Sequence, residues 1–137
     1  MDQFEDCIIF QLAKAYQKAH GLFKKRILPY GLTPIQHLIL EALWMQDGIP
    51  AKDIGKRLVL DRATLSGVLD RMSSGGWITK RQDPQDKRTL RISLTDKGRD
   101  LKPSLAMERN QANEELLNGL NLEETILLKR LLKDIQN

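Results

Sequence analysis

The residues with the clearest chemistry form a basic segment at 80–91, KRQDPQDKRTLR, which holds five basic and two acidic residues. A basic loop can place a guanidinium in the minor groove of DNA, where narrow A·T tracts concentrate negative potential. Arg88 is our candidate for that contact. Asp86 lies two residues earlier, so it could pair with Arg88 and fix its direction. The alternative is that Arg88 is a solvated charge in a surface loop.

A second candidate surface lies at 62–73, where the pattern predicts a helix with one apolar edge and one edge of small and polar residues. Such an edge can enter the major groove of DNA without steric conflict. Arg62 could read guanine or bind phosphate, and the hydroxyls of Thr64 and Ser66 could do either. Thr64 could instead cap the helix together with Asp61. Further candidates for phosphate contacts are Lys56, Arg57, Lys80 and Lys87.

The elements that must position these side chains are a helix-turn-helix and a β-hairpin. Apolar spacing predicts helices at about 51–58 and 62–73, and the small Gly55 lets two helices cross closely around a tight turn. Strands are predicted at 77–81 and 90–94, and the second alternates apolar and polar residues, as a strand with one buried face does. This order indicates a winged helix-turn-helix with a basic wing, and it predicts DNA binding.

Helical periodicity extends well beyond the winged helix. It predicts long helices at 3–28, about 96–118 and about 123–136, and a further helix that starts after Thr33. Thr33 fits an N-cap, Pro34 the first helical position and Gln36 the third residue of a capping box. Thr95 is expected to cap the 96–118 helix, in which Pro103 predicts a kink or a loosely packed first turn.

The expected fold class is therefore mainly α with a small β-hairpin wing. Residues 32–95 would form the winged helix-turn-helix DNA-binding domain, and residues 1–31 and 96–137 a helical dimerisation region. Two of the three terminal helices are too long and apolar to be stable alone. A twofold dimer would match two recognition helices to the two half-sites of a pseudo-palindromic operator. The alternative is a monomer in which the terminal helices pack on each other.

Composition narrows the class of protein further. The net charge of +4 and the pI of about 9.3 favour polyanionic partners. The single cysteine excludes an internal disulfide, which suits a reducing cytoplasm. The N-terminus lacks the order of a signal peptide, and no apolar run approaches the ~20 residues that a membrane span needs. We expect a cytoplasmic protein with no membrane partner.

Two other functions compete with DNA binding. An enzyme is not expected, because the chain shows no phosphate-cradling glycine loop, nucleophile elbow, HExxH or paired CxxC. Two histidines and scattered acids are too few to indicate a metal site, and no cofactor is expected. A winged helix that serves only as a protein adaptor predicts a non-basic wing and an apolar recognition edge, and this sequence has neither.

Four segments carry a family resemblance that covers essentially the whole chain. They are LTPIQHLILEAL at 32–43, LDRATLSGVLDRM at 60–72, GWI at 76–78 and DPQDKRTLRISLTDKG at 83–98. Together they resemble the MarR family of bacterial transcriptional regulators. The last segment is similar to the wing signature of that family, which falls here on Asp83, Asp86, Arg88, Leu94, Thr95 and Gly98.

The resemblance implies a homodimer built from helices at both termini, with a winged helix in each subunit. It also implies a repressor that releases DNA when a small aromatic or phenolic ligand binds between the two domains. Candidate polar contacts for such a ligand are Tyr16, His20, His37 and Met45. Packing in the core or on the surface is an equal alternative for these residues.

A thiol signal is the second possibility that the resemblance raises. The branch of the family that responds to organic hydroperoxides carries its reactive cysteine at a place similar to Cys7. The adjacent Glu5 and Asp6 disfavour a thiolate, which is the form that peroxide oxidises. The tyrosines that support the sulfur in that branch fall here on Gln11 and Gly21. The alternative is that Cys7 is a small buried hydrophobe.

Overall fold

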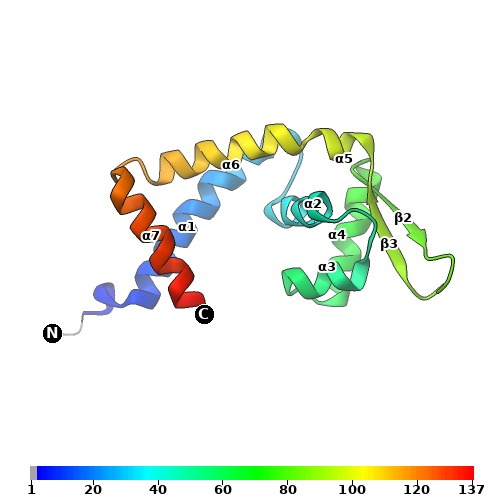
Figure 1. The fold of residues 1–137 in the computed structure, drawn as a ribbon, viewed down its shortest axis with the longest axis horizontal. Helices are drawn as coiled ribbons and strands as arrows, with labels where there is room; N and C mark the ends of the chain where they lie inside the picture. The colour runs from blue at the N-terminus through cyan, green and yellow to red at the C-terminus, as the bar shows by residue number, and fades with distance from the viewer. Residues whose placement is uncertain (1–2) are drawn as a thin grey trace. The chain divides into compact units, whose positions relative to one another are not determined.

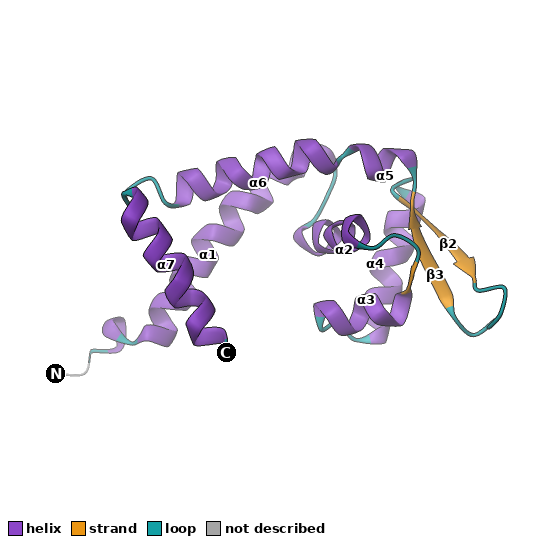
Figure 2. Ribbon diagram, in the orientation of Figure 1, coloured by secondary structure: helices purple, strands orange, loops and turns teal. Residues whose placement is uncertain are grey.

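The computed structural model describes residues 3–137, which are mostly helical with a small antiparallel sheet (Figures 1 and 2). The fold class predicted from the sequence is confirmed. The elements in chain order are η1 (Phe4–Asp6), α1 (Ile8–Ile27), η2 (Leu28–Tyr30), α2 (Pro34–Met45), β1 (Ile49–Pro50), α3 (Ala51–Leu58), α4 (Arg62–Ser74), β2 (Ile78–Gln82), β3 (Leu90–Leu94), α5 (Asp96–Asp100), α6 (Lys102–Leu116) and α7 (Leu122–Gln136).

The predicted helix starts are confirmed by their caps. The Thr33 side chain accepts a hydrogen bond from the Gln36 backbone, and the Gln36 side chain accepts one from the Thr33 backbone. At the start of α4 the Asp61 side chain accepts the Thr64 backbone amide, and at the start of α5 the Thr95 side chain accepts the Gly98 backbone amide. Each cap satisfies a backbone donor that the first helical turn leaves without a partner.

Two expected helices differ from the structure, and one strand was not expected. The helix predicted at 96–118 is divided into α5 and α6 at Leu101, so that Pro103 lies in the first turn of α6. Proline is tolerated there because the first-turn amides have no partner in the helix, whereas inside a longer helix it would remove a hydrogen bond. The helix predicted at 3–28 begins only at Ile8, after the 3-10 turn η1. The two-residue strand β1 was not predicted because it is too short to show a pattern.

The sheet has the strand order β1-β3-β2, and both pairings are antiparallel. In the wing, Ile78 pairs with Leu94 and Gln82 with Leu90. On the other side of β3, Ile49 pairs with Ile92. The wing is therefore a hairpin of β2 and β3 whose second strand is also held by β1.

The chain divides into two compact units. Unit 2 spans Ile27–Ala106 and contains the whole winged helix, whereas unit 1 comprises Met1–Arg26 and Met107–Asn137. Basic and acidic residues are equal in number in unit 1, so the net charge of +4 lies in unit 2. The fully buried side chains of the core also belong to unit 2, and they are Ile27, Ile39, Leu40, Leu43, Ile54, Leu69, Met72, Ile78, Ile92 and Leu105.

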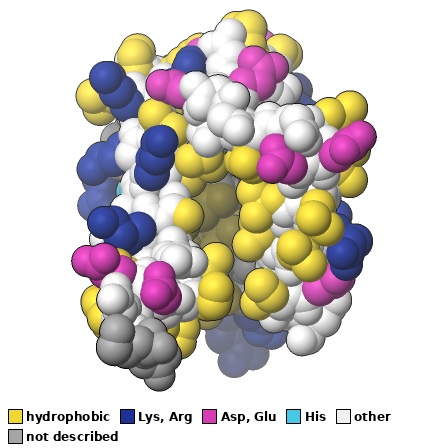
Figure 3. Space-filling view, turned by 90° about the vertical axis from the view of Figure 1, so that its left-hand side faces the viewer, with side chains coloured by type: hydrophobic (Ala, Val, Ile, Leu, Met, Phe, Trp, Pro, Cys, Tyr) yellow, Lys and Arg dark blue, Asp and Glu magenta, His cyan; other side chains and the backbone are white. Residues whose placement is uncertain are grey.

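Unit 1 leaves most of its large apolar side chains exposed. Figure 3 looks onto this unit and shows hydrophobic side chains gathered along both sides of a hollow. No helix in the described part of the chain is both long and apolar enough to cross a membrane. The exposed apolar residues of unit 1 are Phe4, Ile8, Ile9, Leu12, Tyr16, Met107, Leu120, Leu122, Ile126, Leu127, Leu131, Leu132 and Ile135.

Candidate nucleic-acid interface

The helix-turn-helix is built from α3 and α4, which contact each other around Gly55. A Cβ at Gly55 would lie 3.3 Å from both the Leu60 carbonyl oxygen and a Leu65 methyl carbon. The absent side chain is therefore what lets the two helices approach closely, as the sequence predicted. Val59 ends α3 in the left-handed region with φ of 55°, which is unfavourable for a β-branched residue.

The start of α4 is fixed by Asp61. Its carboxylate accepts hydrogen bonds from the Thr64 backbone amide at 2.7 Å and from the Thr64 hydroxyl at 3.0 Å. These bonds hold the pKa of Asp61 below its usual value. Because the Thr64 hydroxyl donates to Asp61, the structure favours its capping role. Arg62 and Ser66 lie exposed on the same helix.

The wing tip is shaped by Asp86. One oxygen of its carboxylate accepts the Arg88 backbone amide at 3.0 Å, and the other accepts the Thr89 hydroxyl at 3.1 Å. The same carboxylate lies 3.8 Å from Arg88 Nε, so the predicted pairing of the two residues is present. The Arg88 side chain is 96% exposed and is free to reach a partner outside the chain.

A second carboxylate, Asp83, holds the other end of the wing loop. It accepts the Gln85 amide at 2.8 Å and Arg91 Nε at 2.7 Å, while its own amide donates to the Thr89 carbonyl at 2.9 Å. The Gln85 amide first, and then Arg91, lower the pKa of Asp83. The loop between β2 and β3 is thus closed by the carboxylates of two aspartates, Asp83 and Asp86.

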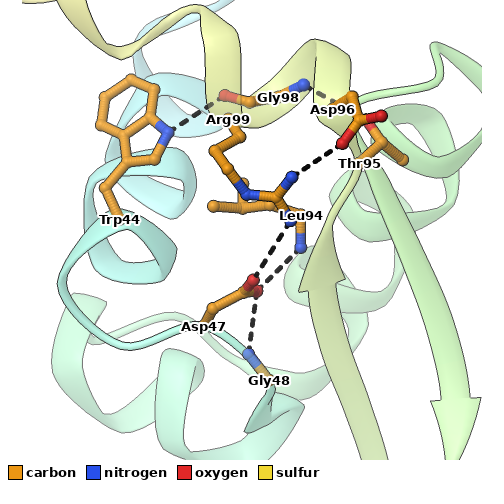
Figure 4. A network of polar contacts seen from close by, with 8 residues as sticks. All are labelled: Trp44, Asp47, Gly48, Leu94, Thr95, Asp96, Gly98 and Arg99. Carbon is orange, nitrogen blue, oxygen red and sulfur yellow. Dashed lines mark hydrogen bonds and ion pairs between the residues drawn. The ribbon is translucent and has the colours of Figure 1, made fainter.

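The base of the wing is attached to α2 and α5 by a polar network (Figure 4). Asp47 accepts the backbone amides of Gly48 at 2.9 Å and Leu94 at 2.8 Å, and lies 3.9 Å from Arg99. Trp44 Nε1 donates to the Gly98 carbonyl at 3.0 Å. Residues from three parts of the chain are joined there, which fixes where β3 leaves the body of unit 2.

A groove of about 990 Å³ lies between the helix-turn-helix and the wing. Its charged lining has more basic than acidic side chains, and the acidic ones are engaged within the chain: Asp61 caps α4, Asp86 shapes the wing tip and Asp70 forms an ion pair with Lys80. The basic lining residues are Lys52, Lys56, Arg62, Lys80 and Arg88. A positive concave surface of this kind suits a phosphate backbone.

The structure brings most of the predicted DNA-contact residues to this groove, including Lys56, Arg62, Ser66, Lys80 and Arg88. The other two phosphate candidates lie outside the groove lining. Arg57 donates to the Gln46 side chain at 2.7 Å, and Lys87 is exposed on the wing tip. Sequence reasoning missed three residues of this region: Lys52, Val59 and Arg91. The positive charge of Lys52 and Arg91 was visible, but their positions depend on packing.

The predicted ligand contacts are divided between the two units. In unit 1, the rings of Tyr16 and His20 lie 5.6 Å apart between centroids. In unit 2, His37 is buried with Nε2 3.0 Å from Glu41 Oε1, and its ring meets the edge of Trp44 at 6.2 Å. Met45, also in unit 2, is exposed. Within the described residues, no group of three or more histidine, cysteine or acidic side chains could hold a metal ion.

Cys7 lies between η1 and α1, and its thiol is exposed. Its carbonyl accepts the Gln11 amide at 2.9 Å, so the residue stands at the start of α1. The interpretation of Cys7 as a buried hydrophobe is therefore wrong for the single chain, because the helix begins only after this residue and does not carry it into a core.

Comparison with known proteins gives a consistent result. The model of the MarR family matches residues 32–90. The regulator TtmR of Methylorubrum extorquens is 37% identical over 94 residues, which are 69% of this chain and 47% of the relative, so the chain spans about half of that protein. The regulator SarZ of Staphylococcus saprophyticus is 31% identical over 132 residues, covering 96% of this chain and 87% of the relative.

Solved structures agree over nearly the full length. A probable transcriptional regulator from Pseudomonas aeruginosa superposes with a TM-score of 0.88 at 34% identity, covering 97% of this chain and 99% of that one. BpsR of Bordetella bronchiseptica superposes with a TM-score of 0.87 at 28% identity, covering 100% and 98%. The DNA binding of BpsR is regulated by 6-hydroxynicotinic acid.

Proposed function

This chain belongs to the MarR family of DNA-binding transcriptional regulators, and we propose that it is a homodimeric repressor which a small aromatic ligand releases from its operator. The observation that carries the DNA-binding part is the basic groove between α4 and the wing, with Arg62, Ser66 and Arg88 exposed beside it. The helix would enter the major groove and the wing arginine the minor groove.

Substitution of Arg88 tests this assignment. Arg88→Ala should weaken binding to the operator by about 1–3 kcal/mol, because one contact to a DNA groove is lost. The helix caps and the buried core of the protein do not involve the Arg88 side chain, so the fold should be unchanged. The matched control is Lys102→Ala, an exposed basic residue of α6 that does not line the groove. Equal affinity of Arg88→Ala and the wild type in a gel shift at ~0.15 M salt would remove Arg88 from the interface.

The homodimer is supported by the exposed apolar surface of unit 1. Ile9 of α1 is 79% exposed and Ile126 of α7 is 59% exposed, whereas a chain that is stable alone rarely leaves so much contiguous apolar surface in water. A second copy would cover this surface and place two recognition helices on half-sites about 34 Å apart.

The proposed effector is a phenol or an aryl carboxylate. The support is chemical: BpsR, which this chain resembles over its full length, responds to an aromatic acid. Tyr16 and His20 in unit 1 offer two neighbouring, tilted rings with polar atoms, and His37 in unit 2 offers an imidazole beside Trp44. Aryl carboxylates are the first class to screen, by the release of labelled operator DNA and by an increase in the melting temperature.

A thiol switch at Cys7 is the second candidate, and the exposure of its sulfur favours it. Cys7→Ser separates the two signals. If an aromatic ligand is the signal, the variant keeps both DNA binding and the response to that ligand. If peroxide at low concentration releases DNA from the wild type and not from Cys7→Ser, the signal is oxidation of the thiol.

A further inference from the structure

We propose that Arg91 is a positioning residue of the wing, which anchors the wing loop to the body of the winged helix and thereby fixes Arg88 for DNA. The inference rests on the DNA binding proposed above. Arg91 lies on β3, the central strand of the sheet, between β1 and β2. From that place one guanidinium reaches both neighbours of the strand.

The contacts of Arg91 join the two edges of the sheet. Nη1 donates to the Gly48 carbonyl at 2.9 Å, just before β1, and Nε donates to Asp83 Oδ2 at 2.7 Å, just after β2. The forked, planar guanidinium can make both bonds at once, which a single ammonium on a flexible stem does less well. The side chain therefore connects the wing loop to a segment 43 residues away in the sequence.

From Asp83 the anchor continues to the wing tip. The Asp83 side chain is only 14% exposed. Its carboxylate accepts the Gln85 amide, and its backbone amide donates to the Thr89 carbonyl. The Thr89 amide in turn donates to the Asp86 carbonyl at 2.9 Å, and Asp86 holds the Arg88 amide. A chain of hydrogen bonds thus leads from Arg91 to the backbone of Arg88.

A comparison with Arg81 distinguishes the positioning role of Arg91 from a simple electrostatic attraction for DNA. Arg81 stands directly opposite Arg91 in the β2–β3 register, so the two like charges share one face of the hairpin. The Arg81 side chain is exposed and forms no hydrogen bond or ion pair with the residues that the structure describes. Arg91, by contrast, is committed to Asp83 and Gly48. If Arg91 acted only by its charge, Arg81 would contribute as much to binding.

Three variants test the proposal: Arg91→Gln, its matched control Arg81→Gln, and Asp83→Asn. The first two remove the same charge from the same face, so each should reduce the salt dependence of DNA binding by a similar small amount. Arg91→Gln should weaken binding roughly tenfold more than Arg81→Gln, because only this variant frees the loop. Asp83→Asn makes the wing more positive, yet it should also weaken binding, since its ion pair with Arg91 is lost.

Hydrogen exchange of the free protein supplies a readout that does not involve DNA. The amides of Gln85, Arg88 and Thr89 should exchange faster in Arg91→Gln and Asp83→Asn, and at the wild-type rate in Arg81→Gln. The proposal is overturned if Arg91→Gln matches Arg81→Gln in affinity and exchange, or if Asp83→Asn binds DNA more tightly. If the wild type binds no duplex DNA, the proposed function fails. The exchange rates of the free protein still test the anchor in that case: faster exchange in Arg91→Gln supports it, and unchanged exchange contradicts it.

Discussion

Asp47 should be the residue whose loss most loosens the base of the wing. Its Oδ1 accepts two backbone amides, from Gly48 in the loop before β1 and from Leu94 at the end of β3 (Figure 4). Leu94 is buried, so its amide has little water to replace the lost acceptor. We therefore expect Asp47→Ala to destabilise unit 2 and to leave α2 and β3 less firmly joined.

The magnitude follows from those two bonds. A hydrogen bond to a charged acceptor contributes about 1.5–3 kcal/mol when it is shielded. The Asp47 side chain is 42% exposed, which lowers that contribution, and its exposed pair with Arg99 at 3.9 Å adds about 0–1 kcal/mol. We expect Asp47→Ala to lower the free energy of unfolding by about 2–3 kcal/mol. Asp47→Asn should cost about half as much, because the amide oxygen still accepts both donors.

Thermal and urea unfolding at one fixed protein concentration measure the effect, since the stability of a dimer depends on concentration. The expected fall in melting temperature is roughly 10 °C for Asp47→Ala. Asp96→Ala is the control: Asp96 also pairs with Arg99, at 2.8 Å, but its side chain is 94% exposed. If Asp47→Ala differs from Asp96→Ala by less than about 0.5 kcal/mol, the two amide bonds do not stabilise the wing base.

Three further outcomes are expected. Val59→Gly should raise the free energy of unfolding by about 0.5–1 kcal/mol, because glycine adopts a φ of 55° without strain. The Val59 side chain is 89% exposed, so its removal loses few packing contacts. An unchanged or lower urea midpoint would contradict this expectation. Leu131→Glu should yield monomers in sedimentation, since a carboxylate in an apolar interface costs several kcal/mol, and an intact dimer would place α7 outside the interface. Because the pKa of Asp61 is lowered, its stabilising effect is complete above the ordinary carboxyl range and is lost as the pH falls through about 4 and below. When unfolding is measured from pH 6 downwards, the free energy of unfolding should therefore fall less steeply in Asp61→Ala than in the wild type.

Local signals in the sequence predicted most of the elements. The Thr33 capping box, the Asp61 cap and the Thr95 cap each act within three residues, so the residues themselves set where α2, α4 and α5 begin. The alternation at 90–94 predicted the strand and the burial of Ile92 and Leu94, whereas Leu90 on the same face is exposed. The pairing of Asp86 with Arg88 was predictable for the same reason, because the two residues belong to one turn.

Only the structure shows where the predicted helices divide and which partners their polar residues choose. Pro103 predicted a kink or a loosely packed first turn, but only the structure places the break at Leu101 and the proline inside the first turn of α6. Thr64 had two possible roles, and its hydroxyl donates to Asp61. Lys80 was a candidate for phosphate contacts on charge alone, and in the structure it forms an ion pair with Asp70 of α4.

By itself, then, the sequence determined most of the elements, the basic wing and the family, because caps, periodicity and charge are properties of neighbouring residues. Only the tertiary structure decided which distant groups meet. Asp47 accepts the amide of Leu94, 47 residues later, and Arg91 donates to the carbonyl of Gly48, 43 residues earlier. An aspartate or an arginine can serve many partners, and its partner is chosen by how the strands and helices bring backbone groups within about 3 Å.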